Sequence, residues 1–484
     1  EHVTDNDEAV GSIPTTRTPV PHPPLCIGWL RGRHGFIFST DYFLLTTNYS
    51  HMNYKITGGK KLSGSVTTNI SKNAAVGLLC ASLLNRGTTI LRRMPRIEEV
   101  NRLMEVLESI GVGIVREENG DVRIKPPAQF NLQNINHAAA GKTRSIVMFI
   151  APLAHLFDSF ELPLPGGCKL GGRTMMPHVQ ALAKLGIHIS EGSANTLRIE
   201  AKEKHAGEIV MYEASDTGTE NALMAAAKIK GQTTVKFASA NYAIQDLCVF
   251  LGQCGVKIEG IGTTTLVVHG VSEINSDLTV YPSEDPIESM FFISLSATTK
   301  SKITIKRCPI DFLELELATL DQMGLRFESG GVYSADNGHT RLVDITVYSS
   351  ELTAPPEKIA PRPYPGINID NLPFFVPIAT QARGRTLIHD WIYEDRASYY
   401  MEMVKLGAKM ELADPHRVFI EGPTSLHSAD IEAPPALRPA TLLLIGMLAA
   451  EGNSTLYNVY PINRGYEKLH ERLAKLGASV EAVE

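Results

Sequence analysis

The stretch TLLLIGMLAAEGNSTLYNVYPINRGYEKLHERLAKLGASV, residues 441–480, contains one complete example of the pattern that decides the fold. Its first ten residues are apolar almost throughout, which predicts a helix that is buried on all sides. A glycine turn at Gly452 and a short β-rich run follow. The next segment has the spacing of an amphipathic helix and ends at Gly477, where a glycine in the left-handed conformation would stop the helix. The stretch therefore predicts a buried helix, a strand, an amphipathic helix and a final strand.

The same pattern recurs along the chain, with clear copies at 77–115, 222–258 and 374–410 and two weaker copies that end near residues 189 and 327. The glycine that would end the second helix occurs six times, at intervals of 69 to 83 residues: Gly111, Gly186, Gly255, Gly324, Gly407 and Gly477. A second set would play the same part after the first helix: Gly87, Gly231, Gly384 and Gly452. This regularity predicts six copies of one βαβαβ-type unit, rather than unrelated domains, and an α/β fold. Several units must pack together to bury the apolar first helices.

The composition is that of a globular protein long enough for two or more domains, with 484 residues of which 43% are hydrophobic and 20% charged. The net charge is −6 and basic residues are scattered, so we expect no nucleic-acid partner and no membrane-surface contact. No apolar run approaches the roughly 18 residues of a membrane span.

The six cysteines form no CxxC pair and have no histidines at zinc-ligand spacing, which predicts reduced thiols, no metal site and a cytoplasmic location. Four of them are expected to be inert packing residues: Cys80, Cys248, Cys254 and Cys308. Residues 1–51 contain prolines and aromatic residues without a stable period. We expect this segment to be a disordered or non-native extension, with Met52 as a possible natural start.

Cationic residues occur at equivalent places in several units. Lys72, Arg144 and Arg438 each stand at the start of a predicted helix, where unpaired N–H groups and the helix dipole already favour an anion. Three further arginines offer forked donors suited to carboxylate or phosphate: Arg173, Arg396 and Arg464. Any one of these could be an ordinary solvated surface residue, but their matched repeat positions favour an anion-binding site.

At these residues the sequence resembles the bacterial enolpyruvyl transferases, in order and without a large gap over about 54–482. The motifs that carry the resemblance are SKNAA (71–75), KTRS (142–145), LPGGCKLGGR (164–173), TGTENALMAAA (217–227), PYPGINIDN (363–371) and NRGYEKLHERLAKLGA (463–478). The glycine-rich loop around Cys168 indicates the branch that acts on UDP-N-acetylglucosamine, because the branch that acts on shikimate 3-phosphate has no such loop.

The resemblance implies a reaction and a fold. The enolpyruvyl group of phosphoenolpyruvate would pass to the 3-hydroxyl of UDP-N-acetylglucosamine with release of phosphate, without metal or organic cofactor, as the first committed step of peptidoglycan synthesis. The fold would be a two-domain inside-out α/β barrel with three units in each domain. One domain would comprise 53–71 and 283–484 and the other 72–282, with chain crossings near Lys72 and Ser283 and the active site between them.

The resemblance also implies roles for particular residues. Cys168 would deliver a proton, assist product release and be the site that fosfomycin alkylates, and its glycine-flanked, cationic loop would favour the thiolate. Asp370 would be the base near the acceptor hydroxyl, although an aspartate after PYPG is also common in turns. Lys72, Arg173, Arg438 and Arg464 would hold the donor's phosphate and carboxylate, supported by Arg144 and Arg396. The acceptor would be contacted by Asn73, His178, Ser215, Thr217 and Gly218.

Some positions depart from the family pattern. RTMMPH (173–178) replaces the usual Arg-Pro-Val-Asp-Leu-His that holds uracil, Ala436 stands where an aspartate is usual, and EDPIES (284–289) lacks an expected arginine. The departures leave three alternatives: the peptidoglycan enzyme, a paralogue that acts on another nucleotide or nucleoside, and a non-catalytic nucleotide-sugar-binding protein. The retained thiol, base and arginines argue against the third.

Overall fold

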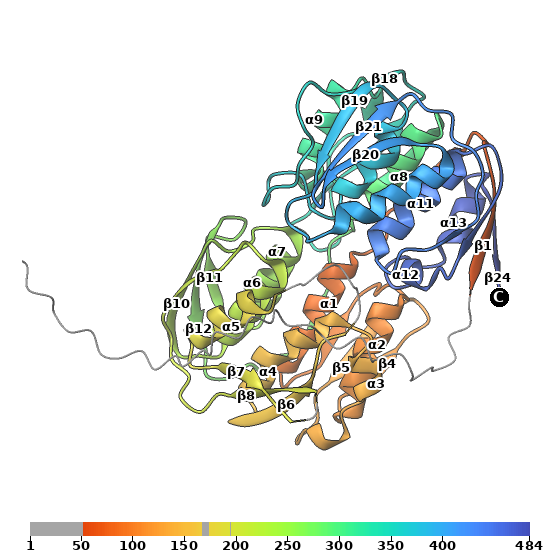
Figure 1. Ribbon diagram of the computed structural model, residues 1–484. Coiled ribbons are helices and arrows are strands. Elements are labelled where there is room, and N and C mark those ends of the chain that lie inside the picture. The colour runs from red at the N-terminus through yellow and green to blue at the C-terminus, as the bar shows by residue number, and fades with distance from the viewer. Residues whose placement is uncertain (1–51, 167–173, 194) are drawn as a thin grey trace, which may run out of the picture. The chain divides into compact units, whose positions relative to one another are not determined.

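The computed structural model describes residues 52–166, 174–193 and 195–484 (Figure 1). The segment 1–51, Cys168 and Arg173 lie outside the described residues. Helices alternate with strands along the chain, so the prediction of an α/β fold is confirmed. No helix in the described ranges has the length and apolar character that crossing a membrane requires.

The strands of the described part form six separate sheets. The first sheet contains, in strand order, β13 (Leu278–Val280), β3 (Thr89–Leu91), β5 (Val122–Lys125) and β4 (Gly113–Arg116). The second contains β9 (Glu208–Val210), β10 (Gly231–Lys236), β12 (Thr265–Gly270) and β11 (Lys257–Glu259). The third contains β6 (Ser159–Pro163), β8 (Thr196–Glu200) and β7 (His188–Glu191). The fourth sheet contains β2 (Ser63–Thr67), β14 (Lys302–Pro309), β17 (Arg341–Val347) and β15 (Phe327–Ser329), and β16 (Tyr333–Ser334) also pairs with β17. The fifth contains β18 (Leu352–Thr353), β19 (Ala382–His389), β21 (Arg417–Gly422) and β20 (Lys409–Asp414). The sixth contains β22 (Ile431–Glu432), β23 (Gly452–Tyr457), β1 (Asn53–Gly58) and β24 (Ser479–Val483).

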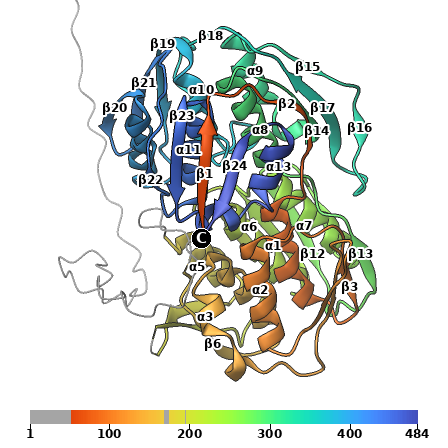
Figure 2. The ribbon, with the colours of Figure 1, turned by 90° about the vertical axis from the view of Figure 1, so that its right-hand side faces the viewer.

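Five of these sheets share one arrangement, in which one parallel pair adjoins two antiparallel pairs. The sheet that contains β6 has only antiparallel pairs among the described residues. In the last sheet, the first strand of the described chain, β1, lies between β23 and β24 near the C-terminus (Figure 2). A common strand arrangement is what a repeated unit produces.

The α-helices are α1 (Lys72–Ala81), α2 (Glu98–Ser109), α3 (His137–Ala140), α4 (Ile150–Ala154), α5 (Met176–Ala183), α6 (Asp216–Ala227), α7 (Tyr242–Gln253), α8 (Pro286–Thr298), α9 (Glu314–Gln322), α10 (Phe375–Ala379), α11 (Leu437–Ala449), α12 (Tyr460–Asn463) and α13 (Leu469–Lys475). The 3-10 helices are η1 (Ser82–Leu84), η2 (Leu132–Asn134), η3 (Arg144–Phe149), η4 (Ile310–Phe312), η5 (Leu372–Phe374) and η6 (Arg396–Leu406). Every residue of α8 is buried, and α11 is buried except at its C-terminal residue, as expected of apolar first helices. The second helix of the fifth unit differs from the expectation, because it is the 3-10 helix η6.

The glycines that close the second helices behave as predicted. All six have positive φ, between 76° and 100°, a conformation in which a side chain is strained. Gly231, Gly384 and Gly452 also have positive φ and lie at or near the start of a strand. The prediction is wrong for Gly87, whose φ is not positive. A Cβ atom there would lie 2.3 Å from the Ser276 carbonyl oxygen, so close backbone approach requires this glycine.

The buried hydrophobic residues gather in two clusters. One draws on 54–66 and 287–478 together with Ala74, Tyr242 and Ala243. The other lies within 75–280. α7 therefore contributes its first two residues to one cluster and its later residues to the other.

Two chain segments lie side by side between these clusters. Ile70 forms an isolated antiparallel bridge with Glu284. The Ser71 N–H donates to the Ser283 carbonyl oxygen over 2.8 Å, and the Asp285 N–H donates to that of Asn69 over 2.9 Å. These bonds hold the start of α1 beside the start of α8.

Candidate active site

Asp370 lies between two arginines that come from distant parts of the chain. Its Oδ2 is 3.4 Å from Nη2 of Arg438, the second residue of α11, and its Oδ1 is 3.9 Å from Nη1 of Arg396 at the start of η6. The Asp370 N–H donates to Oδ1 of Asn368 over 2.8 Å, which fixes the turn that presents the carboxylate. Arg438 is nearly fully buried, and its Nη1 donates to the Tyr466 hydroxyl over 3.1 Å. The structure thus brings Asp370, Arg396 and Arg438 together as predicted neighbours.

Lys72 stands at the first position of α1 and is electrostatically coupled to the same group. Burial lowers the pKa of its amine. Arg464 and Arg438 lower it further, whereas Glu99 and Asp370 raise it. Opposing charges from four segments therefore lie within electrostatic reach of one ammonium.

Arg464 is held by a carboxylate that the sequence analysis did not single out. Its Nη2 lies 2.6 Å from Oε2 of Glu99, and both side chains are nearly fully buried. The hydroxyls of Thr143 and Ser145 donate to the other oxygen, Oε1, over 2.5 and 3.2 Å. Burial raises the pKa of the Glu99 carboxyl, but Lys72, Arg464 and the Thr143 hydrogen bond lower it below its usual value. Glu99 is therefore an ionised anchor for the cationic cluster.

A signal for Glu99 was present in the sequence. Glu99 occupies the first turn of α2, on the same face as the buried Leu103, Val106 and Leu107. A carboxylate on an apolar helix face is rarely buried without a partner. That pattern identifies a buried ion pair but not which cation completes it.

Arg396 is fully buried, with no exposed side-chain surface. Its Nε and Nη2 lie 2.6 and 2.9 Å from the two carboxylate oxygens of Asp390, and Nη2 also donates to the Ile369 carbonyl oxygen over 2.9 Å. The Tyr400 hydroxyl donates to Asp390 Oδ2 over 2.5 Å. The alternative that Arg396 is an ordinary solvated surface residue is therefore wrong.

Asn73 is placed by contacts on both sides of its carboxamide. Its Nδ2 donates to the Tyr242 hydroxyl over 3.2 Å, and its Oδ1 accepts from the Lys72 ammonium over 3.5 Å. Burial holds the pKa of the Tyr242 phenol well above its usual value, so Tyr242 stays neutral. The carboxamide is therefore oriented beside the cationic cluster.

The predicted acceptor residues around α6 form a second group. Asn221 Nδ2 donates to Nδ1 of the buried His178 over 2.9 Å, and Nε2 of His178 lies 3.3 Å from the Thr217 hydroxyl. Ser215 caps α6 by accepting from the Gly218 N–H over 3.3 Å. The Gly218 donor is thus used within the cap of this conformation.

A further acidic residue, Asp216, connects this second group with the first. It accepts from the Ser239 hydroxyl over 2.5 Å and from Asn241 Nδ2 over 3.1 Å. Burial raises the pKa of its carboxyl, and the charge of Asp370 raises it further. The first turn of α6 therefore carries a carboxylate within electrostatic reach of Asp370.

Arg144 begins η3, between the two residues that hold Glu99. Its Nη2 donates to the Thr174 carbonyl oxygen over 3.1 Å, next to the end of the cysteine loop. In the segment RTMMPH, Met176 stands where the family pattern has an aspartate, and its side chain is 39% exposed. No described contact tests base recognition there.

The four cysteines expected to be inert are buried, and burial raises the pKa of each thiol, which confirms the prediction: Cys80, Cys248, Cys254 and Cys308. Among the described residues, no three or more His, Cys, Asp or Glu side chains are grouped to hold a metal ion.

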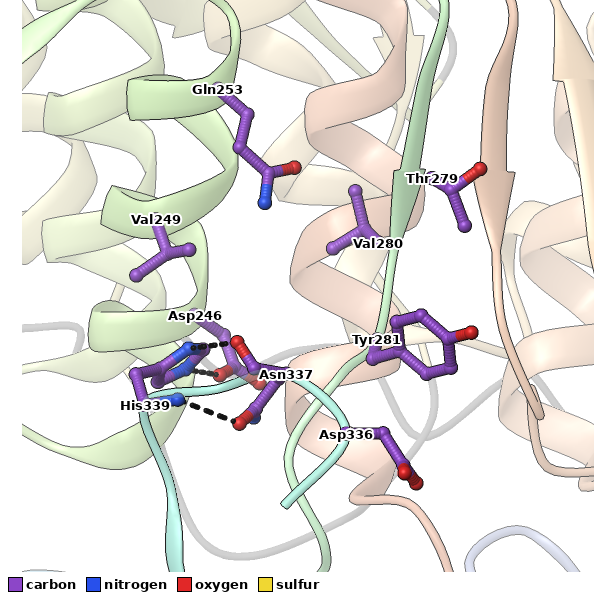
Figure 3. Close-up of a pocket in the computed structure, with 9 residues that line it drawn as sticks. All are labelled: Asp246, Val249, Gln253, Thr279, Val280, Tyr281, Asp336, Asn337 and His339. Atoms are coloured by element: carbon purple, nitrogen blue, oxygen red, sulfur yellow. Dashed lines mark hydrogen bonds and ion pairs between the residues drawn. The ribbon is translucent and has the colours of Figure 1, made fainter. Parts of the chain in front are cut away.

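A separate cavity of about 220 Å³ contains none of the predicted site residues (Figure 3). Asp246 of α7 and His339 of the β16–β17 turn meet on its wall, with His339 Nε2 2.8 Å from Asp246 Oδ1. Asp246 Oδ1 also accepts from the Ser283 hydroxyl over 2.6 Å. This network braces the segment that leads into α8.

The chain is similar to known proteins over most of its length. The family model of EPSP synthase (3-phosphoshikimate 1-carboxyvinyltransferase) matches residues 56–473. The UDP-N-acetylglucosamine 1-carboxyvinyltransferase of Borreliella burgdorferi is 31% identical over 89% of this chain and 99% of its own length, and that of Treponema denticola is 32% identical over the same shares.

Two solved structures share the fold. The enolpyruvyl transferase NikO from Streptomyces tendae has a TM-score of 0.78 at 22% identity and covers 90% of this chain and 99% of its own. An EPSP synthase from Acinetobacter baumannii has a TM-score of 0.69 at 18% identity, over 90% and 100% of the two chains. Because the family model and relatives above 30% identity both span most of its length, the chain belongs to the EPSP synthase family of enolpyruvyl (carboxyvinyl) transferases.

Proposed function

We propose that this enzyme transfers the enolpyruvyl group of phosphoenolpyruvate to the 3-hydroxyl of UDP-N-acetylglucosamine and releases phosphate. The observation that carries the proposal is the convergence of Lys72, Arg438 and Arg464 on the neighbourhood of Asp370. The names of the full-length relatives support the choice of acceptor.

The cationic cluster suits the donor, which is a trianion. Two unlike charges about 4 Å apart attract by about 4 kcal/mol at an effective dielectric constant of 20, but by only about 1 kcal/mol in water. Lys72, Arg438 and Arg464, with Arg173 of the cysteine loop, hold the donor's phosphate and carboxylate. Arg144 and Arg396 support the same pocket. Partial burial of the cluster makes each of these contacts effective.

The reaction is an addition followed by an elimination. Asp370 takes the proton of the acceptor hydroxyl while the hydroxyl oxygen bonds to C2 of phosphoenolpyruvate. Cys168 delivers a proton to the methylene carbon in the same step. The Cys168 thiolate then takes a proton back from the new methyl group as the C2–O bond to phosphate breaks. Inorganic phosphate leaves, and the enolpyruvyl ether remains on the acceptor.

The acceptor lies along α1 and α6 in this proposal. Asn73 contacts the sugar, and Ser215, Thr217 and Gly218 lie by the nucleotide phosphates with His178 behind them. Gly218 is freed for this contact only if the Ser215 cap rearranges. The glycines of the cysteine loop allow it to open and close over the site.

The remaining expectations belong to the same proposal. The two hydrophobic clusters are the cores of two domains of three units each, 53–71 with 283–484 and 72–282, in an inside-out barrel. The product enters peptidoglycan synthesis in the cytoplasm, for which buried, reduced thiols are suited. Fosfomycin alkylates Cys168.

A second candidate acceptor is another nucleotide or nucleoside. The Asp216 carboxylate in the first turn of α6 favours it, because that turn is where the main proposal places two phosphates. Like charges repel each other there, and Met176 offers no polar group to a base.

The proposal is tested by phosphate release from phosphoenolpyruvate, measured with UDP-N-acetylglucosamine and with a panel of nucleotides and nucleosides. Cys168→Ala is the control for the chemical step. Release that requires UDP-N-acetylglucosamine supports the main proposal, whereas release only with another acceptor supports the second. If no acceptor elicits release, the proposed reaction is wrong.

A further inference from the structure

We propose that Asp390 is a positioning residue, which holds the guanidinium of Arg396 back from a hydrogen-bonded ion pair with Asp370. Tyr400 assists by fixing the Asp390 carboxylate. The inference rests on the proposed function in one respect, the role of Asp370 as the base. It assigns roles to two residues that are outside the proposed substrate contacts, and Asp390 acts through its bonds to Arg396.

The three side chains form a closed, fully buried unit. None of Asp390, Arg396 and Tyr400 has exposed surface. Asp390 follows β19, and two hydrogen bonds to His416 fix its backbone. The Asp390 N–H donates to the His416 carbonyl oxygen over 2.7 Å, and His416 Nδ1 lies 2.9 Å from the Asp390 carbonyl oxygen. The carboxylate is therefore a fixed point that can orient the Arg396 guanidinium.

Asp390 uses two of the three nitrogens of the Arg396 guanidinium. Nε and Nη2 point at its two oxygens over 2.6 and 2.9 Å, the fork-to-fork geometry that fixes orientation as well as distance. The Ile369 carbonyl oxygen accepts a further bond from Nη2. The Tyr393 ring packs 4.6 Å from the guanidinium carbon.

The third guanidinium nitrogen of Arg396, Nη1, shows the effect of this restraint. Nη1 is buried and makes no hydrogen bond to any described residue, although Asp370 Oδ1 is only 3.9 Å away. A charged N–H···O bond has a length of about 2.7–2.9 Å, and a buried guanidinium gains by closing to it. The gap of about 1 Å persists because Asp390 and Ile369 hold the other side of the fork.

Tyr400 fixes the orientation of the Asp390 carboxylate. Its hydroxyl donates to Asp390 Oδ2 over 2.5 Å. Burial holds the pKa of the Tyr400 phenol well above its usual value, so that the hydroxyl remains a donor at every physiological pH. A carboxylate with this donor keeps one lone pair directed at Arg396 Nε.

The charge of Asp390 also limits the field at Asp370. Among the described residues, charged and titratable groups that act on Asp370 include Arg396 of η6, Arg438 of α11, Lys72 of α1, Asp216 of α6 and Tyr242 of α7. Arg396 forms two hydrogen bonds with a second carboxylate, that of Asp390, which offsets its charge. A base that accepts a proton from the acceptor must not be bound too tightly by its cations.

The test follows the titration of the Asp370 carboxyl group directly, by ¹³C NMR of protein with labelled aspartate carboxyls. The loss of one resonance in Asp370→Asn assigns the signal. In Asp390→Asn, we expect Asp370 to titrate about 0.5–1 pH unit lower, because Arg396 is no longer neutralised and can close on it. The control Glu402→Gln, on the helix η6 that carries Arg396, removes a half-buried carboxylate partner of Lys405 and should cause no shift.

A double variant keeps the test decisive if Asp390→Asn fails to fold. Asp390→Asn with Arg396→Gln replaces the buried ion pair by a neutral pair, which restores stability. It removes a cation next to Asp370, so we expect Asp370 to titrate higher than in the native protein, by about 1 pH unit. The two variants thus shift the titration in opposite directions, which a merely structural role would not do.

The outcomes separate the inference from the function on which it rests. An unchanged titration of Asp370 in the folded variants overturns the positioning role of Asp390, whatever the activity. Phosphate release that survives in Asp370→Asn overturns the role of Asp370 as the base, while the titration still decides about Asp390. With both intact, Asp390→Asn should lower kcat and leave the acceptor KM within about twofold, since Asp390 lies outside the acceptor contacts.

Discussion

The Glu99 carboxylate compensates a buried cation that lies 365 residues away in the chain. In Glu99→Gln, Arg464 loses its charge partner, and we expect the free energy of unfolding to fall by about 3–5 kcal/mol, as measured by urea denaturation. The double variant Glu99→Gln with Arg464→Gln should recover most of this loss. Equal losses in the single and double variants would show that the ion pair is not what Glu99 contributes.

Asp285 predicts a pH dependence of stability. Its side chain caps α8, and burial raises the pKa of its carboxyl from 3.8 to about 6. A carboxyl with a raised pKa in the folded state contributes stability that is fully present below about pH 4 and is lost as the pH rises through 6. The loss is about 3 kcal/mol at most.

Asparagine also caps helices well, so Asp285→Asn should keep α8 and remove this titration. Between pH 4 and pH 8, we expect the free energy of unfolding of the native protein to fall relative to that of the variant. Urea denaturation across that range measures it. A difference that stays constant over the range would contradict the raised pKa.

Asp370→Asn tests the base at the residue scale. Loss of a general base lowers kcat by about 10²–10⁴-fold. The midpoint of thermal unfolding should also fall, because the nearly fully buried Arg438 loses the carboxylate 3.4 Å from its Nη2, whereas Arg396 keeps Asp390. The values of kcat are therefore compared below both midpoints. A variant with native kcat would exclude Asp370 from the proton transfer.

At the residue scale, sequence motifs predicted Lys72, Asp370, Arg438 and Arg464 as site residues. The structure places Asp370 beside Arg438, with both and Arg464 within electrostatic reach of Lys72. Glu99 and Asp390 were missed. Both act by neutralising a cation that is distant in sequence or hidden in the core, and such pairing depends on tertiary packing rather than on local pattern. The roles of Cys168 and Arg173 stay predictions.

Two glycines at the end of α7 test the helix-ending rule at the scale of the element. Gly252 lies inside the helix, whereas Gly255 follows it with φ of 89°, and a Cβ atom on either would meet no heavy atom within 4 Å. Gly252→Ala should therefore raise the free energy of unfolding by about 0.5–1 kcal/mol. Gly255→Ala should lower it by about 1 kcal/mol, because only the left-handed backbone differs. Equal effects in the two variants would show that backbone conformation is not the cause.

The helix-ending glycines and buried first helices could be predicted because each depends on local chemistry. The 3-10 form of η6 could not, since its helix pattern is that of any amphipathic segment and its first residue is fixed by Asp390. Gly87 was assigned to the wrong cause because its close contact, the Ser276 carbonyl, lies on a distant strand connection.

For the whole molecule, the repeat interval predicted recurring units, and five sheets share one strand arrangement. The strand pairing was beyond the sequence analysis. β1 completes a sheet with β23 and β24, and β2 pairs with β14, so two strands at the start of the described chain belong to sheets built much later (Figure 2). Long-range pairing of this kind leaves no local signal.

The central claim is the reaction itself, and the most direct measurement is the identity of the product. The native protein is incubated with phosphoenolpyruvate and UDP-N-acetylglucosamine, and the nucleotide sugar is isolated for mass spectrometry and NMR. We expect a nucleotide sugar that carries one enolpyruvyl ether at its 3-hydroxyl, formed in equal amount with phosphate. Unmodified nucleotide sugar, recovered while another acceptor in a parallel incubation becomes enolpyruvylated, would contradict it.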